Sequence, residues 1–264
     1  MGAKDIVLRP IDRREADAVV RRVHYSGKVV QNSQLHIGVF YQGRLEGAMQ
    51  FGPSLDKRKI QGLVVGTPWN GFIELNRMAF TDALPRNSES RALSVAMRLL
   101  RKYAPHVQWV VTFADGAQCG DGTIYRAAGF VLTGIAISKN LVRLPSGMVV
   151  HKMTLESSPT APRAELGGRS YYDVTGGRYD LAKYARLVDG VVIPGFQLRY
   201  IYFVDTAARL RLSVPEIPFS EIARRGASMY RGKKRAESID SDAAGFQSAE
   251  GGAGPTSALQ IHDT

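Results

Sequence analysis

The stretch VQWVVTFADGAQCGDGTIYRAAGFVLTGIAI, residues 107–137, carries the clearest indication of the fold class. It opens with a near-continuous apolar run that ends at Asp115, which is typical of a buried strand. A turn rich in glycine and aspartate follows, and then a short helical segment, 122–130, that carries Tyr125 and ends in a Gly-Phe pair. Residues 131–137 are apolar again and predict the next strand. A strand–turn–helix–strand unit of this kind indicates an α/β protein.

The same alternation continues on both sides of this unit. Two apolar runs within 35–52 meet at a Tyr-Gln-Gly turn and predict a hairpin. Residues 72–80 predict a strand, and 88–105 predict the strongest helix, with Ser88 as the expected N-cap. Further elements are expected as a helix that closes with residues 18–25, a strand at 198–205 and a helix at 219–230. The expected fold class is α/β, with a mixed, mostly antiparallel central sheet flanked by helices and a C-terminal extension.

Length and composition exclude several classes of protein. A chain of 264 residues can bury a substantial core as one large domain or two small ones. No apolar run approaches the ~18 residues of a membrane span, and charged residues stand where a signal peptide needs an apolar block. Cys119 is the only cysteine, so no internal disulfide can form and a reducing cytoplasm is expected.

Charge is distributed unevenly along the chain. Residues 236–264 contain five acids and no Lys or Arg, so residues 1–235 carry 35 basic and 19 acidic side chains, a formal charge of +16. A body this basic favours a polyanionic partner, usually nucleic acid. We expect one folded domain over 1–235, with 156–195 as an excursion or insertion and 196–235 as a returning strand and basic helix. Residues 236–264, rich in Gly, Ser and Ala, are expected to be a disordered acidic tail.

Four polar motifs in a fixed order carry a resemblance to a known family. They are HYSGK at 24–28, GVFYQGRLEGAMQFGPSLDK at 38–57, ELNRMAFTDALPRNSESRA at 74–92 and FADGAQCGDGTIYRAAGFVLTG at 113–134. Together they resemble the Mom family of bacteriophage DNA-modification proteins, whose fold is similar to that of the GCN5-related N-acyltransferases. The resemblance covers about residues 20–155 and resumes at the strand expected over 198–205.

The resemblance implies an enzyme that converts adenine in phage DNA to N6-carbamoylmethyl-adenine and so shields the DNA from host restriction. The host cytoplasm is the implied location. The new bond joins N6 to a CH2 carbon, which is unreactive in acetyl-CoA, and a redox metal such as iron could activate that C–H bond. Two other functions stay open: an acetyl-CoA-dependent N-acyltransferase that acts on a protein or small amine, and a DNA-binding protein without catalysis.

The loop LPRNSESRA, 84–92, precedes the strongest helix, where the resemblance implies a site for acetyl-CoA or a related acyl-CoA. Backbone N–H groups and the positive end of a helix receive phosphate. The loop is not glycine-rich, so side chains are expected to make the contacts. Tyr125 is implied to contact the coenzyme A sulfur and to protonate the leaving thiolate, against the alternative of a packed aromatic ring. The expected cofactor residues are Arg86, Asn87, Ser88, Ser90 and Arg91.

Further catalytic candidates lie in two motifs upstream of residue 107. His24, Tyr25 and Ser26 follow a helical segment, and His24 is a candidate metal ligand or general base, or else the polar end of that helix. Strand 72–80 carries Glu74 with Asn76 on one face by period two, and Arg77 on the other. These side chains either line a cleft or face solvent.

Asp115 ends the buried strand, where ligands gather in α/β sheets. With His24 and Tyr25 it forms the candidate set of iron ligands. Asp121 is more simply explained as a cap whose side chain accepts the N–H of Thr123 or Ile124. Cys119 has no His or Lys near it in sequence and is expected to be inert.

Double-stranded DNA is the expected partner, with no membrane, and a homodimer is left open. Reaching N6 of a paired adenine requires the base to be unpaired or flipped, and Tyr25, Phe51 or Trp69 could stack on it. Arg and Lys side chains would contact phosphates, although each is otherwise an ordinary surface charge. The candidates are Lys28, Lys57, Arg58, Lys59, Arg143, Arg199, Arg224, Arg225 and the 231–235 cluster with Lys233 and Lys234.

Overall fold

The computed structural model describes residues 2–116, 120–227, 229–230 and 233–234. The predictions for Cys119 and for the tail at 236–264 lie outside the described residues. Within those ranges, none of the helices combines the length and apolarity needed to cross a bilayer.

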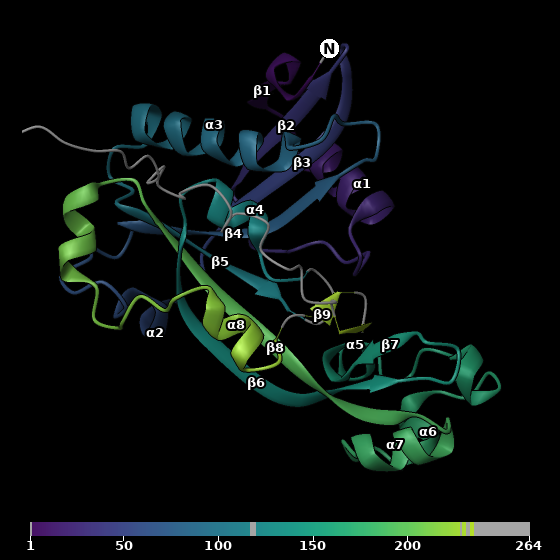
Figure 1. Cartoon of the computed structure of the whole chain (residues 1–264). Coiled ribbons are helices and arrows are strands. Elements are labelled where there is room, and N and C mark those ends of the chain that lie inside the picture. The colour runs from purple at the N-terminus through teal and green to yellow at the C-terminus, as the bar shows by residue number, and fades with distance from the viewer. Residues whose placement is uncertain (1, 117–119, 228, 231–232, 235–264) are drawn as a thin grey trace, which may run out of the picture.

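An eight-stranded sheet in the order β1-β2-β3-β4-β5-β8-β6-β7 forms the centre of the molecule (Figure 1). In the part of the chain that the structure describes, β4 and β5 form the one parallel pair, so the predicted α/β class with a mixed, mostly antiparallel sheet is confirmed. The strands are β1 Val7–Pro10, β2 Leu35–Tyr41, β3 Arg44–Gly52, β4 Phe72–Phe80, β5 Trp109–Asp115, β6 Val131–Arg143, β7 Val149–His151 and β8 Val191–Phe203. A separate pair joins β9 Met229–Tyr230 to β10 Lys233–Lys234.

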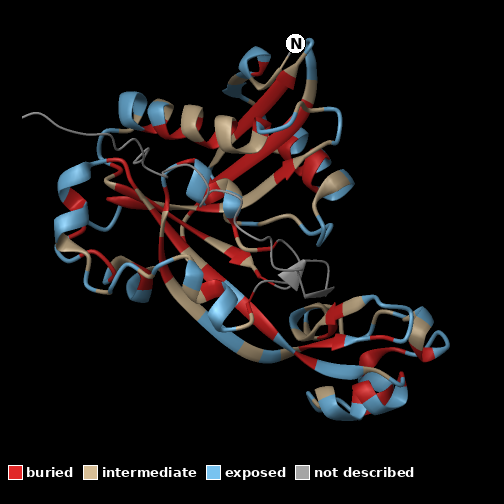
Figure 2. Cartoon of the chain, viewed as in Figure 1, coloured by how far each residue is buried: buried red, intermediate tan, exposed pale blue. Residues whose placement is uncertain are grey.

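Helices cover both faces of the sheet (Figures 1 and 2). On one face α3 and α4 pack over the largest cluster of buried side chains. On the other face α1 covers one end, while α2 and η3 cover the other. The α-helices are α1 Arg13–Val23, α2 Lys57–Gln61, α3 Ser88–Tyr103, α4 Thr123–Ala127, α5 Lys152–Glu156, α6 Tyr171–Thr175, α7 Leu181–Leu187 and α8 Ser220–Arg224. The 3-10 helices are η1 Ala3–Asp5, η2 Ala164–Leu166 and η3 Thr206–Arg211.

The predicted hairpin of β2 and β3 is confirmed. Its turn consists of Gln42 and Gly43, with φ of 50° and 78°. A two-residue turn with positive φ at both positions matches the twist of the strands it joins. On its other side β3 pairs with β4, where Gln50 lies opposite Arg77 and Gly52 lies opposite Glu74.

A bulge in β4 overturns one prediction. Phe51 pairs with Leu75 but Gln50 pairs with Arg77, so β4 has one extra residue, Asn76, at this point. A bulge shifts the alternation by one position. Arg77 therefore lies on the same face as Glu74, and the expectation that it points to the opposite face is wrong. The bulge brings the two charged side chains together.

Strands β4 and β5 pair over only part of their lengths. Phe72–Leu75 pair with Trp109–Thr112, whereas β4 continues to Phe80 and β5 to Asp115. Residues 113–115 pair with β8 instead. The two strands separate just after Leu75 on β4. The polar side chains that follow on β4 therefore lie where no β5 residue pairs with that strand.

Strands β6 and β8 are both 13 residues long and extend beyond β5 as a two-stranded ribbon. The ribbon carries β7 and helices α5, α6 and α7 at its far end (Figure 1). These elements have a hydrophobic cluster of their own, with Leu155, Tyr171 and Tyr184 at its centre. The Lys28 Nζ atom donates to Ser157 Oγ at 2.5 Å, so this small unit touches the loop that follows α1.

Three predicted helix boundaries were wrong. Ser88 is the first residue of α3, and Asn87 occupies the N-cap position with φ 69°. Helix α1 ends at Val23, which leaves Tyr25 outside it. The helix expected over 219–230 spans only Ser220–Arg224, because Gly226 adopts φ 70° and the chain then enters β9.

Candidate functional site

The loop after α1 holds His24 in one orientation. The backbone N–H of His24 donates to Val20 O at 3.0 Å, which closes the helix. The backbone N–H of Ser26 donates to His24 Nδ1 at 3.2 Å, and Ser26 Oγ lies 2.8 Å from the same atom. Since a backbone amide can only donate, Nδ1 is the acceptor and the proton of the neutral ring sits on Nε2. His24 is thus arranged as a hydrogen-bond donor through Nε2.

His24 stays neutral at physiological pH. Burial, and after it the positive charge of Arg77, lowers its pKa to about 4. Tyr25 lies beside it, with the ring centroids 4.4 Å apart, and is 59% exposed. The loop therefore presents an N–H donor together with an accessible aromatic ring.

Strand β4 places a second set of polar groups next to this loop. Arg77 Nε donates to Lys28 O at 3.2 Å, and Arg77 Nη1 donates to Asn76 O at 2.7 Å. Burial raises the pKa of Glu74, while the side chains of Ser54 and Asn76 and the charge of Arg77 oppose that rise. We call His24, Ser54, Glu74, Asn76 and Arg77 the β4 cluster.

Gly52 lies beside the β4 cluster at a position where no side chain can be accommodated. A Cβ atom at this position would lie 2.6 Å from Asn32 O and 2.8 Å from Asn76 Oδ1. Neither neighbour can be displaced without moving the loop before β2 or the bulge in β4. The glycine therefore lets the loop before β2 pack closely against β3 and the bulge in β4.

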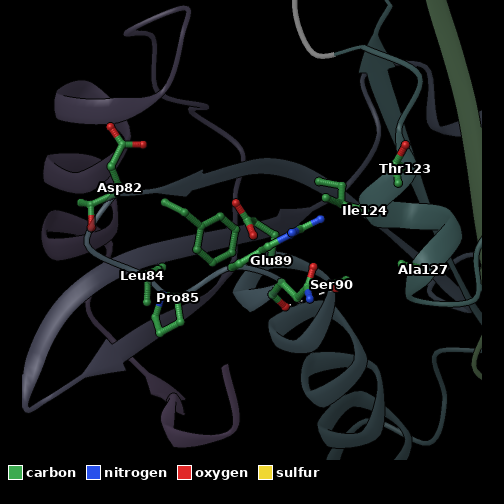
Figure 3. Close-up of a pocket in the computed structure, with 12 residues that line it drawn as sticks. Asp82, Leu84, Pro85, Glu89, Ser90, Thr123, Ile124 and Ala127 are labelled. Atoms are coloured by element: carbon green, nitrogen blue, oxygen red, sulfur yellow. Dashed lines mark hydrogen bonds between the residues drawn. The ribbon is translucent and has the colours of Figure 1, made fainter. Parts of the chain in front are cut away.

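A cavity of about 350 Å³ lies near the start of α3 (Figure 3). It is bounded by the loop after β4, the first turn of α3 and one side of α4. Its size is that of a small-molecule site. The lining residues are Phe80, Thr81, Asp82, Leu84, Pro85, Arg86, Asn87, Glu89, Ser90, Thr123, Ile124 and Ala127.

Three of the five predicted cofactor residues line this cavity: Arg86, Asn87 and Ser90. Ser88 does not, because it is fully buried and its hydroxyl donates to Pro85 O at 2.6 Å. Arg91 is also absent from the lining. The start of a 16-residue helix together with Arg86 suits an anion. The carboxylates of Asp82 and Glu89 in the same lining oppose it.

Tyr125 lies on the side of α4 that faces the core. It is 8% exposed and does not line the cavity. Its ring packs against Phe130, with centroids 5.6 Å apart, and against Tyr200 at 5.2 Å. The packed-aromatic alternative describes this environment, and the role at the coenzyme A sulfur stays a prediction.

Tyr200 is a site residue that the sequence did not reveal. Its hydroxyl donates to Asp121 O at 2.5 Å, and burial raises its pKa. A Cβ at Gly122 would lie 2.6 Å from this hydroxyl. The Asp121 side chain accepts the N–H of Thr123 at 3.1 Å as predicted, but Asp121 is not the N-cap of α4, because Gly122 occupies that position. Tyr200 thus holds the turn that starts α4. The sequence indicated this residue only through its position in the strand expected over 198–205.

The predicted iron ligands come from two places in the fold, with His24 and Tyr25 in the loop after α1 and Asp115 at the end of β5. Among the described residues, no three His, Cys, Asp or Glu side chains are grouped to hold a metal ion. A metal could bind His24 at Nε2 only if the ring proton moved to Nδ1, which accepts the backbone N–H of Ser26. Asp115 pairs with Gln197 at the end of β5. The set of His24, Tyr25 and Asp115 as iron ligands therefore stays a prediction.

The predicted DNA contacts lie in separate places. Arg58 and Lys59 are exposed on α2, beside Lys57, whose Nζ lies 4.3 Å from the centre of the Trp69 ring. Arg143 is exposed at the far end of β6. Arg224 and Arg225 both pair with Glu221, and Arg199 is half-buried and donates to Thr133. The side chains of Lys233 and Lys234 are not among those described.

One aromatic prediction is contradicted. Phe51 is fully buried in the core beneath α3, because the β3–β4 register turns it away from the β4 cluster, and it cannot stack on a base. Trp69 is 52% exposed, so it and Tyr25 remain accessible.

Comparison with known proteins gives consistent results. A model of the Mom protein family matches residues 5–221. The methylcarbamoylase Mom of Escherichia phage Mu is 34% identical over 219 residues, which cover 80% of this chain and 81% of that protein.

Among solved structures, the chain is similar to the ribosomal-protein-S18-alanine N-acetyltransferase of Escherichia coli, at 11% identity and a TM-score of 0.39 over 76% of this chain and 95% of the other. It is also similar to the IAA acetyltransferase of Bacillus cereus, at 10% identity and a TM-score of 0.42 over 75% and 99%. On the match over 5–221 and the 34% identity, the chain belongs to the Mom protein family.

Proposed function

We propose that the chain is a transferase that modifies DNA, converting adenine to N6-carbamoylmethyl-adenine and protecting phage DNA from restriction in the host cell. Membership of the Mom family and the identity to a phage methylcarbamoylase support this reaction. The formal charge of +16 over residues 1–235 supports a DNA substrate. The observation that carries the proposal is the β4 cluster, which groups an acid, a neutral imidazole and a guanidinium where β4 and β5 separate.

The β4 cluster is the proposed acceptor site for the adenine. Bond formation from N6 to a carbon requires the amine to lose a proton, and Glu74 accepts it. Burial raises the pKa of Glu74 toward the range in which a general base works well. His24 donates from Nε2 to a ring nitrogen or carbonyl of the reactants, with Ser26 holding its tautomer. Asn76 and Arg77 position these groups, and the exposed Tyr25 ring stacks on the base.

The cavity at α3 is the proposed donor site. An acyl-CoA bound there would supply the two-carbon unit, with its phosphates near Arg86 and Ser90. Tyr125, on the adjacent helix, is the proposed acid that protonates the coenzyme A thiolate when an amide nitrogen displaces it from the carbonyl carbon, and Asp115 is proposed to orient the reactants at the end of β5. Joining N6 to the CH2 carbon removes one hydrogen from each atom, and this two-electron oxidation is the chemistry that a bound iron ion would supply.

Protection of DNA in cells tests this proposal. A plasmid is isolated from cells that express the wild-type protein or Glu74→Gln and is digested with endonucleases whose sites contain adenine. We expect resistance with the wild type and full cleavage with Glu74→Gln. Equal cleavage of both plasmids, with soluble protein present, would contradict the proposal.

A further inference from the structure

Leu55 is the most exposed large apolar side chain among the described residues, at 95%. It stands between two unlike neighbours. Ser54 is buried against Glu74 in the β4 cluster. Asp56 caps α2, with its Oδ1 atom accepting from Lys59 N at 3.3 Å, and α2 begins Lys57-Arg58-Lys59.

The position of Leu55 relative to the β4 cluster is fixed by pairing. Gly52 pairs with Glu74 across the sheet, and three residues of chain reach at most about 10 Å. Leu55 therefore lies at the rim of the β4 cluster, on the side that leads to α2. Leu210 is similarly exposed, at 91%, but it lies on η3, and its basic neighbours are already engaged: Arg209 with Glu216, and Arg211 with Val65 O and Gln108.

The edge beside Leu55 is held in place. Lys57 Nζ donates to Asn70 Oδ1 at 3.1 Å and stacks over Trp69. Three cations within five residues of a fully exposed leucine match the chemistry of a DNA duplex, whose phosphates flank an apolar base stack.

An enzyme that moves a base out of a duplex loses the stacking of that base, which costs a few kcal/mol. Proteins offset such losses by inserting an apolar side chain between bases. Resting on the proposed reaction at adenine, we infer that Leu55 enters the space that the target adenine leaves in the duplex. Lys57, Arg58 and Lys59 hold the neighbouring phosphates.

Fluorescence of 2-aminopurine tests the inference without any cofactor. Duplexes carry this adenine analogue in each nearest-neighbour context, and its emission rises when it leaves the stack. We expect the wild type and the matched control Leu210→Ala to raise the emission in at least one context. Leu55→Ala lowers that rise about tenfold or more, since a few kcal/mol of offset is lost. Leu55→Met, which keeps an apolar side chain of similar size, restores it.

Three results would overturn the inference. The first is an equal rise with Leu55→Ala and the wild type. The second is a defect of Leu55→Ala that remains in full when the analogue faces an abasic site. An unpaired base needs no wedge to leave the stack, so the inference predicts that the defect shrinks there. The third is a change in the mass of the protein in solution with Leu55→Ala, which would place Leu55 between two copies of the chain.

Failure of the proposed reaction reads differently from failure of the inference. Nucleosides from cells that express the wild type report the reaction itself. If the wild type modifies adenine and Leu55→Ala raises the emission as much as the wild type does, the role of Leu55 as a wedge is excluded and the proposed reaction stands. If adenine stays unmodified in cells that express the wild type, the proposed reaction is excluded, whatever the emission shows.

Discussion

Arg77 Nε donates to the backbone carbonyl of Lys28 at 3.2 Å, and this hydrogen bond ties β4 to the loop that carries His24. The same guanidinium lowers the pKa of His24 and opposes the rise in the pKa of Glu74. One side chain thus ties the loop to β4 and also shifts the pKa of both groups, with burial as the larger cause in each. The predictions below separate these effects.

Replacing Arg77 should raise the pKa of His24. In Arg77→Gln we expect a pKa above 4 but below the ordinary 6.5, because burial acts first and persists. NMR titration of the imidazole C–H signals measures this. His36, whose pKa is lowered mainly by its own burial, is the internal control and should not move. An unchanged His24 pKa would show that Arg77 does not act on it.

The low pKa of His24 also makes stability depend on pH. Between pH 6.5 and about 4 the unfolded chain binds a proton that the native ring does not. The free energy of unfolding should therefore fall as pH falls through this window. Urea unfolding at several pH values measures the slope, and His24→Gln should reduce it. A slope that is identical in the variant would assign it to other groups.

Glu74 should cost stability while supporting activity. Its native pKa is raised, so above pH 4.5 the native state holds a proton longer than the unfolded chain does. Stability from this group therefore declines as pH rises through that interval. We expect Glu74→Gln to be at least as stable as the wild type at neutral pH and to lose modification. A clear loss of stability at pH 7 would show that the carboxylate is structurally required.

The carboxylates in the cavity should weaken the binding of an anionic donor. Glu89→Gln removes one negative charge from the lining, so coenzyme A should bind about twofold to fivefold more tightly. Asp189→Asn, on an exposed turn of the unit at the end of the ribbon, removes the same charge elsewhere. Calorimetry compares the three proteins. No binding to any of them would remove coenzyme A as the donor.

Two tyrosines in one aromatic group should differ in effect. Tyr200→Phe loses the hydrogen bond to Asp121 O and should lower the free energy of unfolding by about 1 kcal/mol. Tyr125→Phe should fold and bind DNA as the wild type does and lose most modification. Urea unfolding and nucleoside analysis of both variants test this. Unchanged modification in Tyr125→Phe would remove its acid role.

The sequence predicted the sheet because its signals are local. The apolar run before Asp115 and the Gln42-Gly43 turn each determine their own element. The loop at 84–92 was placed correctly for the same reason, since a strand precedes it and a strong helix follows. Helix ends were less accurate, because Asn87 and Gly226 adopt positive φ that residue preferences only partly reveal.

The arrangement of the site could not be predicted by periodicity. The bulge at Asn76 moves Arg77 to the face of Glu74, and strict alternation assigns it to the other face. Phe51 is turned inward by the same register. The tautomer of His24 depends on a backbone amide two residues later, and the contact between Lys28 and Ser157 joins segments 129 residues apart. These are tertiary relationships without a local signal.

Mass spectrometry of nucleosides tests the central claim most directly. DNA is taken from cells that express the soluble wild-type protein, grown with iron, and from cells that express Glu74→Gln. We predict deoxyadenosine that carries one carbamoylmethyl group on N6 in the first sample and unmodified deoxyadenosine in the second. Unmodified deoxyadenosine in both samples would contradict the claim, and acetylated proteins or small amines in the first would point to a plain N-acyltransferase.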